Sequence, residues 1–128
     1  MVQRHRWSAS RRRAAEVPAV NGHGTARGTA GLYAALISGD VLSAALLAEA
    51  TTTQCSGIDA VFGEPVSWGL GFAVDDEGFG MGGTGGSYAG AADGYAFAFV
   101  TAEMGSHDRA TAVENAFRAC LGLRALDE

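Results

Sequence analysis

The chain has 128 residues, of which 48% are hydrophobic and 18% are charged, and its formal net charge is −5. This composition is typical of one globular domain and excludes a disordered chain. No apolar run reaches the roughly 18 residues that a membrane-spanning helix needs, so we expect no membrane partner. Glycine is abundant, with 19 residues, but no three-residue period marks a collagen-like repeat.

The charges divide the chain into a basic head and an acidic body. Five arginines precede the first acidic residue, Glu16, and the other four arginines share the chain with all 14 acidic residues. We expect residues 1–12 to form a disordered, solvated arm. Binding of nucleic acid by this arm is the alternative, which we do not favour because the arm has no aromatic residue beyond Trp7. The basic start never leads into an apolar segment, so it is unlike a secretory signal. The sequence leaves the compartment open, with the cytoplasm as the default.

Three residue types limit the chemistry. The chain contains no lysine, which excludes a lysine base, a Schiff base and a Walker-type phosphate loop. The two cysteines, Cys55 and Cys120, are too few and too far apart for a zinc site or a disulfide framework. The three histidines show no paired metal-ligand spacing. We therefore expect no cofactor and no metal.

Two helices are predicted in the first half of the chain. From Ala26 the apolar residues recur at helical spacing, with Thr25 as a candidate N-cap and Gly39 as a stop. A shorter helical run over residues 44–50 follows Ser43, another capping residue.

The second half predicts strands and a final helix. After a loop-like stretch over 55–65, large and small residues alternate over 68–74, which is typical of a strand. Further strands are expected over 87–92 and 95–101, and the final helix over 112–121. The aromatic residues of these strands are the core candidates: Trp68, Phe72, Tyr95, Phe97 and Phe99.

Two short turns are predicted in this region. The segment from Asp75 to Gly78 ends the first strand, and Asp93-Gly94 suits a two-residue hairpin in which both positions need a positive φ. The order helix, helix, three strands, helix predicts an α+β fold with an antiparallel sheet of about three strands.

A glycine-rich segment from Gly80 to Ser87 joins the first two predicted strands. Gly80, Gly82 and Gly85 match the G-x-G-x-x-G spacing of dinucleotide sites, but a strand follows where such a site needs a helix. A purely structural turn is one alternative. We favour a glycine-lined strand that exposes its backbone to a substrate.

Several motifs, taken in order, resemble one known family. The stretch from Asn21 to Gln54, with its helix, Gly39, second helix and final Thr-Thr-Gln, resembles the β-lactamase-related serine hydrolases. This group contains class C β-lactamases, penicillin-binding-protein-like DD-peptidases and family VIII esterases. Residues 68–72, Trp-Gly-Leu-Gly-Phe, are similar to the family's "YGLGW" strand, and residues 79–87 to its "GHxGxxGG" segment.

The resemblance implies a fold and a substrate class. Residues 13–123 would form the C-terminal part of a β-lactamase/transpeptidase-like domain, with a tail over 124–128. The family hydrolyses an ester or amide through a serine acyl-enzyme, so the implied substrate is a small ester or lactam.

The resemblance also implies a site. Met81, Gly82, Gly83 and Thr84 would line the substrate and oxyanion pocket, with the Thr84 N–H as one oxyanion donor. In the family, Ser-x-x-Lys and Tyr-x-Asn motifs supply the nucleophile and handle its proton. Neither motif occurs here, and Met81 stands where lysine or histidine is expected. A thioether carries no proton and no charge.

We therefore expect an inactive C-terminal fragment of such a hydrolase, whose uncovered sheet edge favours self-association. The alternative is a non-catalytic binding or interaction protein that uses the glycine-lined strand, and a nucleotide-binding module is weaker still. His23, in a turn before the first helix, and Ser87, which we expect to face neighbouring backbone, are interpreted as structural residues.

Overall fold

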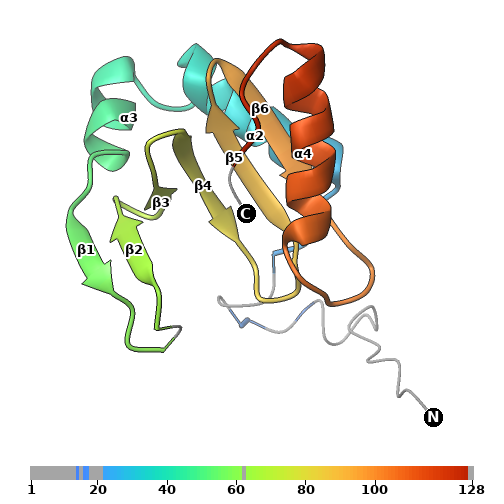
Figure 1. The fold of residues 1–128 in the computed structure, drawn as a ribbon. Coiled ribbons are helices and arrows are strands. Elements are labelled where there is room, and N and C mark those ends of the chain that lie inside the picture. The colour runs from blue at the N-terminus through green and yellow to red at the C-terminus, as the bar shows by residue number, and fades with distance from the viewer. Residues whose placement is uncertain (1–13, 15, 18–21, 62, 127–128) are drawn as a thin grey trace.

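A six-stranded antiparallel meander organises the computed structural model, which describes residues 14, 16–17, 22–61 and 63–126 (Figure 1). The strands lie side by side in chain order from β1 to β6. The prediction of an α+β fold with an antiparallel sheet is confirmed, but the expected number of about three strands is wrong. The strands are β1 (Cys55–Ile58), β2 (Pro65–Trp68), β3 (Ala73–Val74), β4 (Gly78–Gly82), β5 (Tyr88–Ala92) and β6 (Tyr95–Phe99).

Three helices accompany the sheet: α2 (Ala26–Ser38), α3 (Ala44–Ala50) and α4 (Asp108–Cys120). The first begins where the Thr25 side chain accepts a hydrogen bond from the Gly28 N–H at 3.1 Å, and ends at Gly39 with φ of 82°. Ser43 caps α3 through the Leu46 N–H at 3.3 Å. The predicted starts and stops of both helices are confirmed. The expected arm over residues 1–12 lies outside the described residues.

The single strand predicted over residues 68–74 is wrong. Strand β2 ends at Trp68, and the chain turns back to form β3, with the Gly69 N–H donating to the Phe72 carbonyl at 2.8 Å. Gly71, with φ of 88°, allows this turn. The alternation of large residues with glycine in this segment therefore belongs to a tight turn. The stretch over 55–65, which was expected to be a loop, contains β1 and the start of β2.

The glycine-rich segment is half strand and half turn. Gly80 to Gly82 belong to β4, which pairs with β5 over its whole length, so only residues 83–87 form the connection. The Asp93-Gly94 hairpin is confirmed, with φ of 48° and 81°. The turn before β4 is also confirmed, because the Asp75 carboxylate accepts hydrogen bonds from the Glu77 and Gly78 N–H groups.

Helices α2 and α4 cover opposite faces of the sheet (Figure 1). Tyr33 and Leu36 of α2 pack on Ala89 and Ala91 of β5 and form the core with partly buried neighbours, Leu42, Leu47, Phe72, Phe79, Ala96 and Ala98. The alternate residues of β5 and β6 face α4, as the ring contact of Tyr95 with Phe117 shows. Of the five predicted core aromatics, Tyr95 is buried, while the other four are partly exposed.

Helix α4 turns an unusual face to the sheet. Its buried residues are Ala110, Glu114 and Arg118, so a carboxylate and a guanidinium point inward. The apolar residues whose spacing predicted this helix lie beside that face and are largely exposed. Within the described residues, no helix is both long and apolar enough to cross a bilayer.

Candidate functional site

The residues of the sequence-predicted site lie at the end of β4 and in the turn that follows it. Met81 pairs with Ala89 of β5, which belongs to the core under α2, so the Met81 side chain is on the α2 face of the sheet. It is 42% exposed. Gly82 ends the strand, and Gly83 and Thr84 are exposed beyond it. The structure therefore places the four residues consecutively along one exposed ridge.

Backbone hydrogen bonds shape the turn after β4. The Gly83 N–H donates to the Ser87 carbonyl and the Gly86 N–H donates to the Gly83 carbonyl, both at 2.8 Å. Gly86 has φ of 83° and lies against the backbone of Gly105 and Ser106, which leaves no room for a side chain. Because the Gly83 N–H is used in the turn, Thr84 is the exposed position from which a backbone donor could approach an oxyanion.

Two further residues weighed from the sequence are Ser87 and His23. The Ser87 hydroxyl accepts a hydrogen bond from the Thr101 N–H at 3.3 Å, so the expectation that this hydroxyl faces neighbouring backbone is confirmed. His23 is exposed before the Thr25 cap of α2.

The other face of β4 is covered by side chains. A Cβ at Gly82 would lie 2.9 Å from the His107 ring, and a Cβ at Gly80 would lie 3.0 Å from the Tyr88 hydroxyl. A Cβ at Gly90 of β5 would come closer still to the same hydroxyl. These glycines therefore make room for one aromatic and one imidazole ring that lie across the sheet, and on this face the glycine-lined strand is not an open groove.

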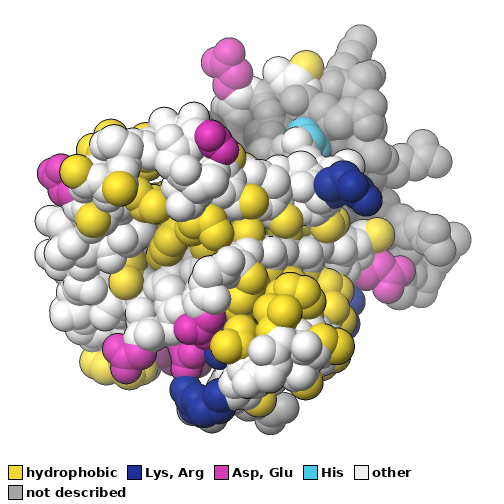
Figure 2. All heavy atoms as spheres, turned by 90° about the horizontal axis from the view of Figure 1, so that it is seen from above, with side chains coloured by type: hydrophobic (Ala, Val, Ile, Leu, Met, Phe, Trp, Pro, Cys, Tyr) yellow, Lys and Arg dark blue, Asp and Glu magenta, His cyan; other side chains and the backbone are white. Residues whose placement is uncertain are grey.

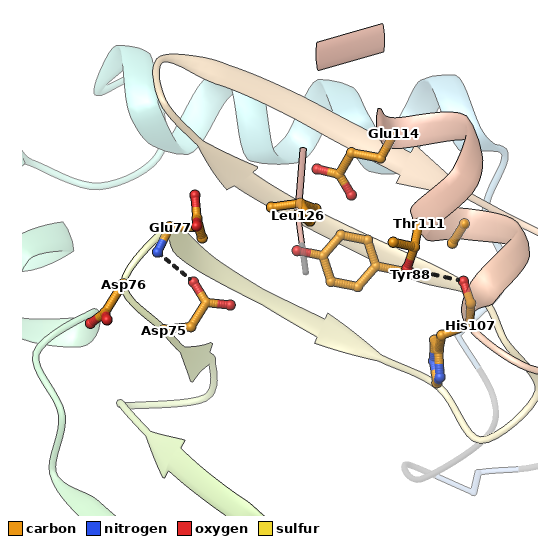
Figure 3. Close-up of a pocket in the computed structure, with 9 residues that line it drawn as sticks. Asp75, Asp76, Glu77, Tyr88, His107, Thr111, Glu114 and Leu126 are labelled. Carbon is orange, nitrogen blue, oxygen red and sulfur yellow. Dashed lines mark hydrogen bonds between the residues drawn. The ribbon is translucent and has the colours of Figure 1, made fainter. Parts of the chain in front are cut away.

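A cavity of about 440 Å³ lies between β4, β5 and α4 on this same face (Figure 3). The Tyr88 ring crosses it, with carboxylates on both sides: Asp75 and Glu77 come from the turn before β4, and Glu114 comes from α4 (Figure 3). The cavity opens on the side of the sheet opposite Met81. The ridge that the sequence predicts and this cavity are therefore separate features.

A buried polar network borders the cavity. The Tyr95 hydroxyl donates to the Glu114 carboxylate at 2.6 Å and accepts from the Arg118 guanidinium at 2.8 Å. Arg118, only 1% exposed, also reaches Asp93 at 3.0 Å and Glu77 at 3.3 Å. Its Nε donates to the Arg124 carbonyl at 2.6 Å, which fixes the segment after α4. The single positive charge of Arg118 is therefore paired within the fold.

Burial changes the acidity of the groups in this region. It raises the pKa of Glu114 above the usual range, although the hydrogen bond from Tyr95 and the charge of Arg118 work in the opposite direction. Burial, with the hydrogen bond to Glu114, raises the pKa of Tyr95 to about 12. Burial also raises the pKa of Tyr88. These phenols keep their protons at neutral pH, so none of them is a ready base there.

No motif in the sequence predicts this network. The i,i+4 spacing of Glu114 and Arg118 was the available signal, but such pairs are usually solvated on a helix surface. Among the described residues, no cluster of three or more His, Cys, Asp or Glu side chains could hold a metal ion.

The chain is similar to a known family of proteins. The family model described as Beta-lactamase matches residues 2–121. The chain belongs to the β-lactamase family. No curated protein matches.

A solved structure agrees with the family assignment. A novel penicillin-binding protein homolog from Caulobacter crescentus is similar, with a TM-score of 0.61 and 34% sequence identity. The match covers 66% of this chain but 28% of that chain. The described elements therefore form a partial β-lactamase or transpeptidase-like fold, and the chain spans well under a third of this relative. The resemblance stated from the sequence motifs is confirmed.

Proposed function

We propose that these 128 residues supply one wall of a β-lactamase-like serine hydrolase site and do not hydrolyse esters or lactams by themselves. Membership of the β-lactamase family supports the reaction class. In that class a serine attacks a carbonyl, and backbone N–H groups stabilise the oxyanion that forms. The wall would be Met81 to Thr84, at the exposed end of β4.

The main support for this proposal is the chemistry of the exposed residues 81–84. Met81 offers a half-exposed thioether that can contact a substrate but cannot move a proton. Thr84 can present a backbone N–H. The 128 residues contain no lysine, and their tyrosines have no Asn two residues later, so the two motifs that would activate a serine are missing. Binding contacts are therefore present without a nucleophile and its base.

The alternative of a binding protein that uses the glycine-lined strand is less well supported. On the α4 face, the Tyr88 and His107 rings occupy the space over Gly80 and Gly82. Among the described residues, the exposed parts of this segment are Met81, on the α2 face of β4, and the turn after Gly82. A nucleotide site is disfavoured further, because four acidic side chains line the cavity on this face.

Direct assays test the proposal. The purified chain is incubated with nitrocefin and with p-nitrophenyl butyrate, and its intact mass is measured before and after. We expect no hydrolysis above the rate in buffer and no covalent adduct. Met81→His is the matched variant, because it restores a residue type that the family uses at this position while leaving the nucleophile absent, so it too should be inactive. Repeated turnover by the wild-type chain, with an adduct on one of its own hydroxyls, would overturn the proposal.

A further inference from the structure

A buried carboxylate has one unpaired oxygen beside the cavity between β4, β5 and α4. Glu114 is only 4% exposed, and its Oε1 accepts the hydrogen bond from Tyr95. Its other oxygen, Oε2, has no hydrogen-bond partner among the described residues. Among those residues, no side-chain nitrogen or oxygen that is sealed from solvent lacks a partner, so Oε2 keeps contact with open space. Figure 3 shows the carboxylate pointing from α4 into the cavity that Glu114 lines.

The Tyr88 hydroxyl is a second unpaired polar group in this cavity. The Tyr88 ring lies along the sheet, since a Cβ at Gly80 of the neighbouring strand would come within 3.0 Å of its hydroxyl. One face of the ring therefore covers the glycines, and the other faces the cavity (Figure 3). Within the described part of the chain, the hydroxyl forms no hydrogen bond. An aromatic face attracts a cation, and a phenol oxygen can accept a hydrogen bond from one.

The negative charges around the cavity are only partly balanced. Arg118 and Arg124 form ion pairs with Glu77, and Figure 2 shows acidic and arginine side chains side by side at the lower edge of the molecule. Neither Glu114 nor Asp75 forms an ion pair with another described residue. Burial and, to a smaller extent, the charge of Asp75 raise the pKa of Glu114. A cation in the cavity would offset the repulsion between these two carboxylates.

The free acceptors fit a primary ammonium group. Such a group has three N–H donors, and each of them needs only one oxygen. A guanidinium prefers to donate two parallel hydrogen bonds to one carboxylate, whereas Glu114 has a single free oxygen. A metal ion is not favoured, because the described residues hold no group of three or more His, Cys, Asp or Glu side chains that could bind one. The cavity of about 440 Å³ is lined in part by Ala110 and Leu126, which offer apolar surface to a short alkyl chain.

We propose that this cavity binds a small primary amine in its ammonium form. The ammonium group donates hydrogen bonds to Glu114 Oε2 and to the Tyr88 hydroxyl, and its charge lies over the Tyr88 ring on the side of Asp75. The alkyl chain contacts Ala110 and Leu126. This inference goes beyond the proposed function and does not depend on it, because it involves no acyl transfer.

The test titrates n-butylammonium chloride into the full nitrogen-15-labelled chain at constant ionic strength and follows the backbone amide shifts by NMR. We expect saturable shifts concentrated in residues 75–77, 88–90 and 110–114. The neutral n-butanol has the same alkyl chain without the charge, so it should bind at least about tenfold more weakly. Butylguanidinium carries the charge on a head group that matches the single free oxygen poorly, and it should also bind more weakly.

Two substitutions test the assigned contacts. Glu114→Gln keeps an acceptor for Tyr95 but removes the charge, and it should weaken butylammonium binding by at least about tenfold. Tyr88→Phe removes only the hydroxyl and should weaken binding by about three- to tenfold. Glu49→Gln is the matched control, because Glu49 is exposed on α3 and its replacement changes the net charge by the same amount. It should change the affinity less than about twofold, since salt screens distant surface charges.

Circular dichroism of each variant separates lost binding from lost folding, and Tyr88→Phe provides the result if Glu114→Gln does not fold. The inference is overturned if the butylammonium shifts do not saturate or lie away from the cavity. It is also overturned if n-butanol or butylguanidinium binds as tightly, or if Glu49→Gln weakens binding as much as the cavity substitutions do. None of these measurements involves an ester or lactam substrate, so their outcome is independent of the test of the proposed function.

Discussion

Arg118 of α4 donates a hydrogen bond to the hydroxyl of Tyr95 on β6, and its guanidinium lies 5.7 Å from the centre of the same ring. This pair joins the C-terminal helix to the sheet where apolar contacts would be expected. Glu114 accepts from the same hydroxyl, and Asp93 and Glu77 balance the guanidinium charge. The position of α4 on the sheet therefore depends on this network.

Replacing the guanidinium should be costly. Arg118→Met keeps much of the side-chain length but leaves Glu114, Asp93 and Glu77 without their cation, and removing one partner of a buried ion pair costs about 3–5 kcal/mol. Urea denaturation should show a loss of this size in the free energy of unfolding. Arg124→Gln is the control, because Arg124 is largely exposed in its pair with Glu77 and such surface pairs are worth at most about 1 kcal/mol. Equal effects of the two substitutions would contradict the structural role given to Arg118.

Glu114 should give the stability a distinctive pH dependence. Burial raises its pKa in the native state, so as pH rises the unfolded chain releases this proton first and the native state is penalised. The contribution of Glu114 is therefore greatest below the unfolded pKa and falls until the pH passes the raised native pKa. Glu114→Gln still offers Tyr95 an acceptor but does not titrate. The unfolding free energy of wild type minus that of the variant, measured from pH 4 to pH 8, should decrease; a constant or rising difference would refute the assignment.

The tyrosines should titrate late in the folded protein. The chain has three, and burial raises the pKa of each of them, that of Tyr95 to about 12. Tyrosinate absorbance at 295 nm should therefore rise at higher pH in buffer than in 8 M urea. Because the unfolded chain loses these protons first, stability should fall as pH rises above about 10. Tyr95→Phe should remove part of that fall, and coincident titration curves in buffer and urea would count against the buried environment.

Local chemistry made much of the fold predictable. Thr25, Ser43 and Gly39 carry the signals that begin and end helices, and Asp93-Gly94 fixes its hairpin through two positive φ angles. Each of these features depends on a few neighbouring residues, so the sequence displays it directly. The family motifs added the order of the elements, and the family assignment was confirmed.

Long-range contacts were not predictable in the same way. The turn after Trp68 is held by the end of α3, some 20 residues earlier, through the Leu70 N–H and the Ala50 carbonyl at 2.8 Å. The alternating pattern alone gives no sign of that contact, and it favoured a straight strand. Similarly, Glu114 and Arg118 are inward only because Tyr95 and the acidic turns meet them there. The roles of Met81 to Thr84 in a site remain predictions from the resemblance.

Gly69 tests the contact between this turn and α3. A Cβ at residue 69 would lie 2.3 Å from the Ala50 carbonyl oxygen, which is backbone and accepts the Leu70 hydrogen bond, so it cannot move aside without breaking that bond. Gly69→Ala should therefore lower the free energy of unfolding by about 1–3 kcal/mol, the usual range for overpacking. Gly31→Ala is the matched control with the opposite sign: nothing lies within 4 Å of its Cβ position in the middle of α2, and alanine should stabilise the helix by up to about 1 kcal/mol. Chemical denaturation of wild type and the two variants measures these free energies of unfolding. If Gly69→Ala leaves the free energy of unfolding unchanged, the turn does not contact α3 in solution.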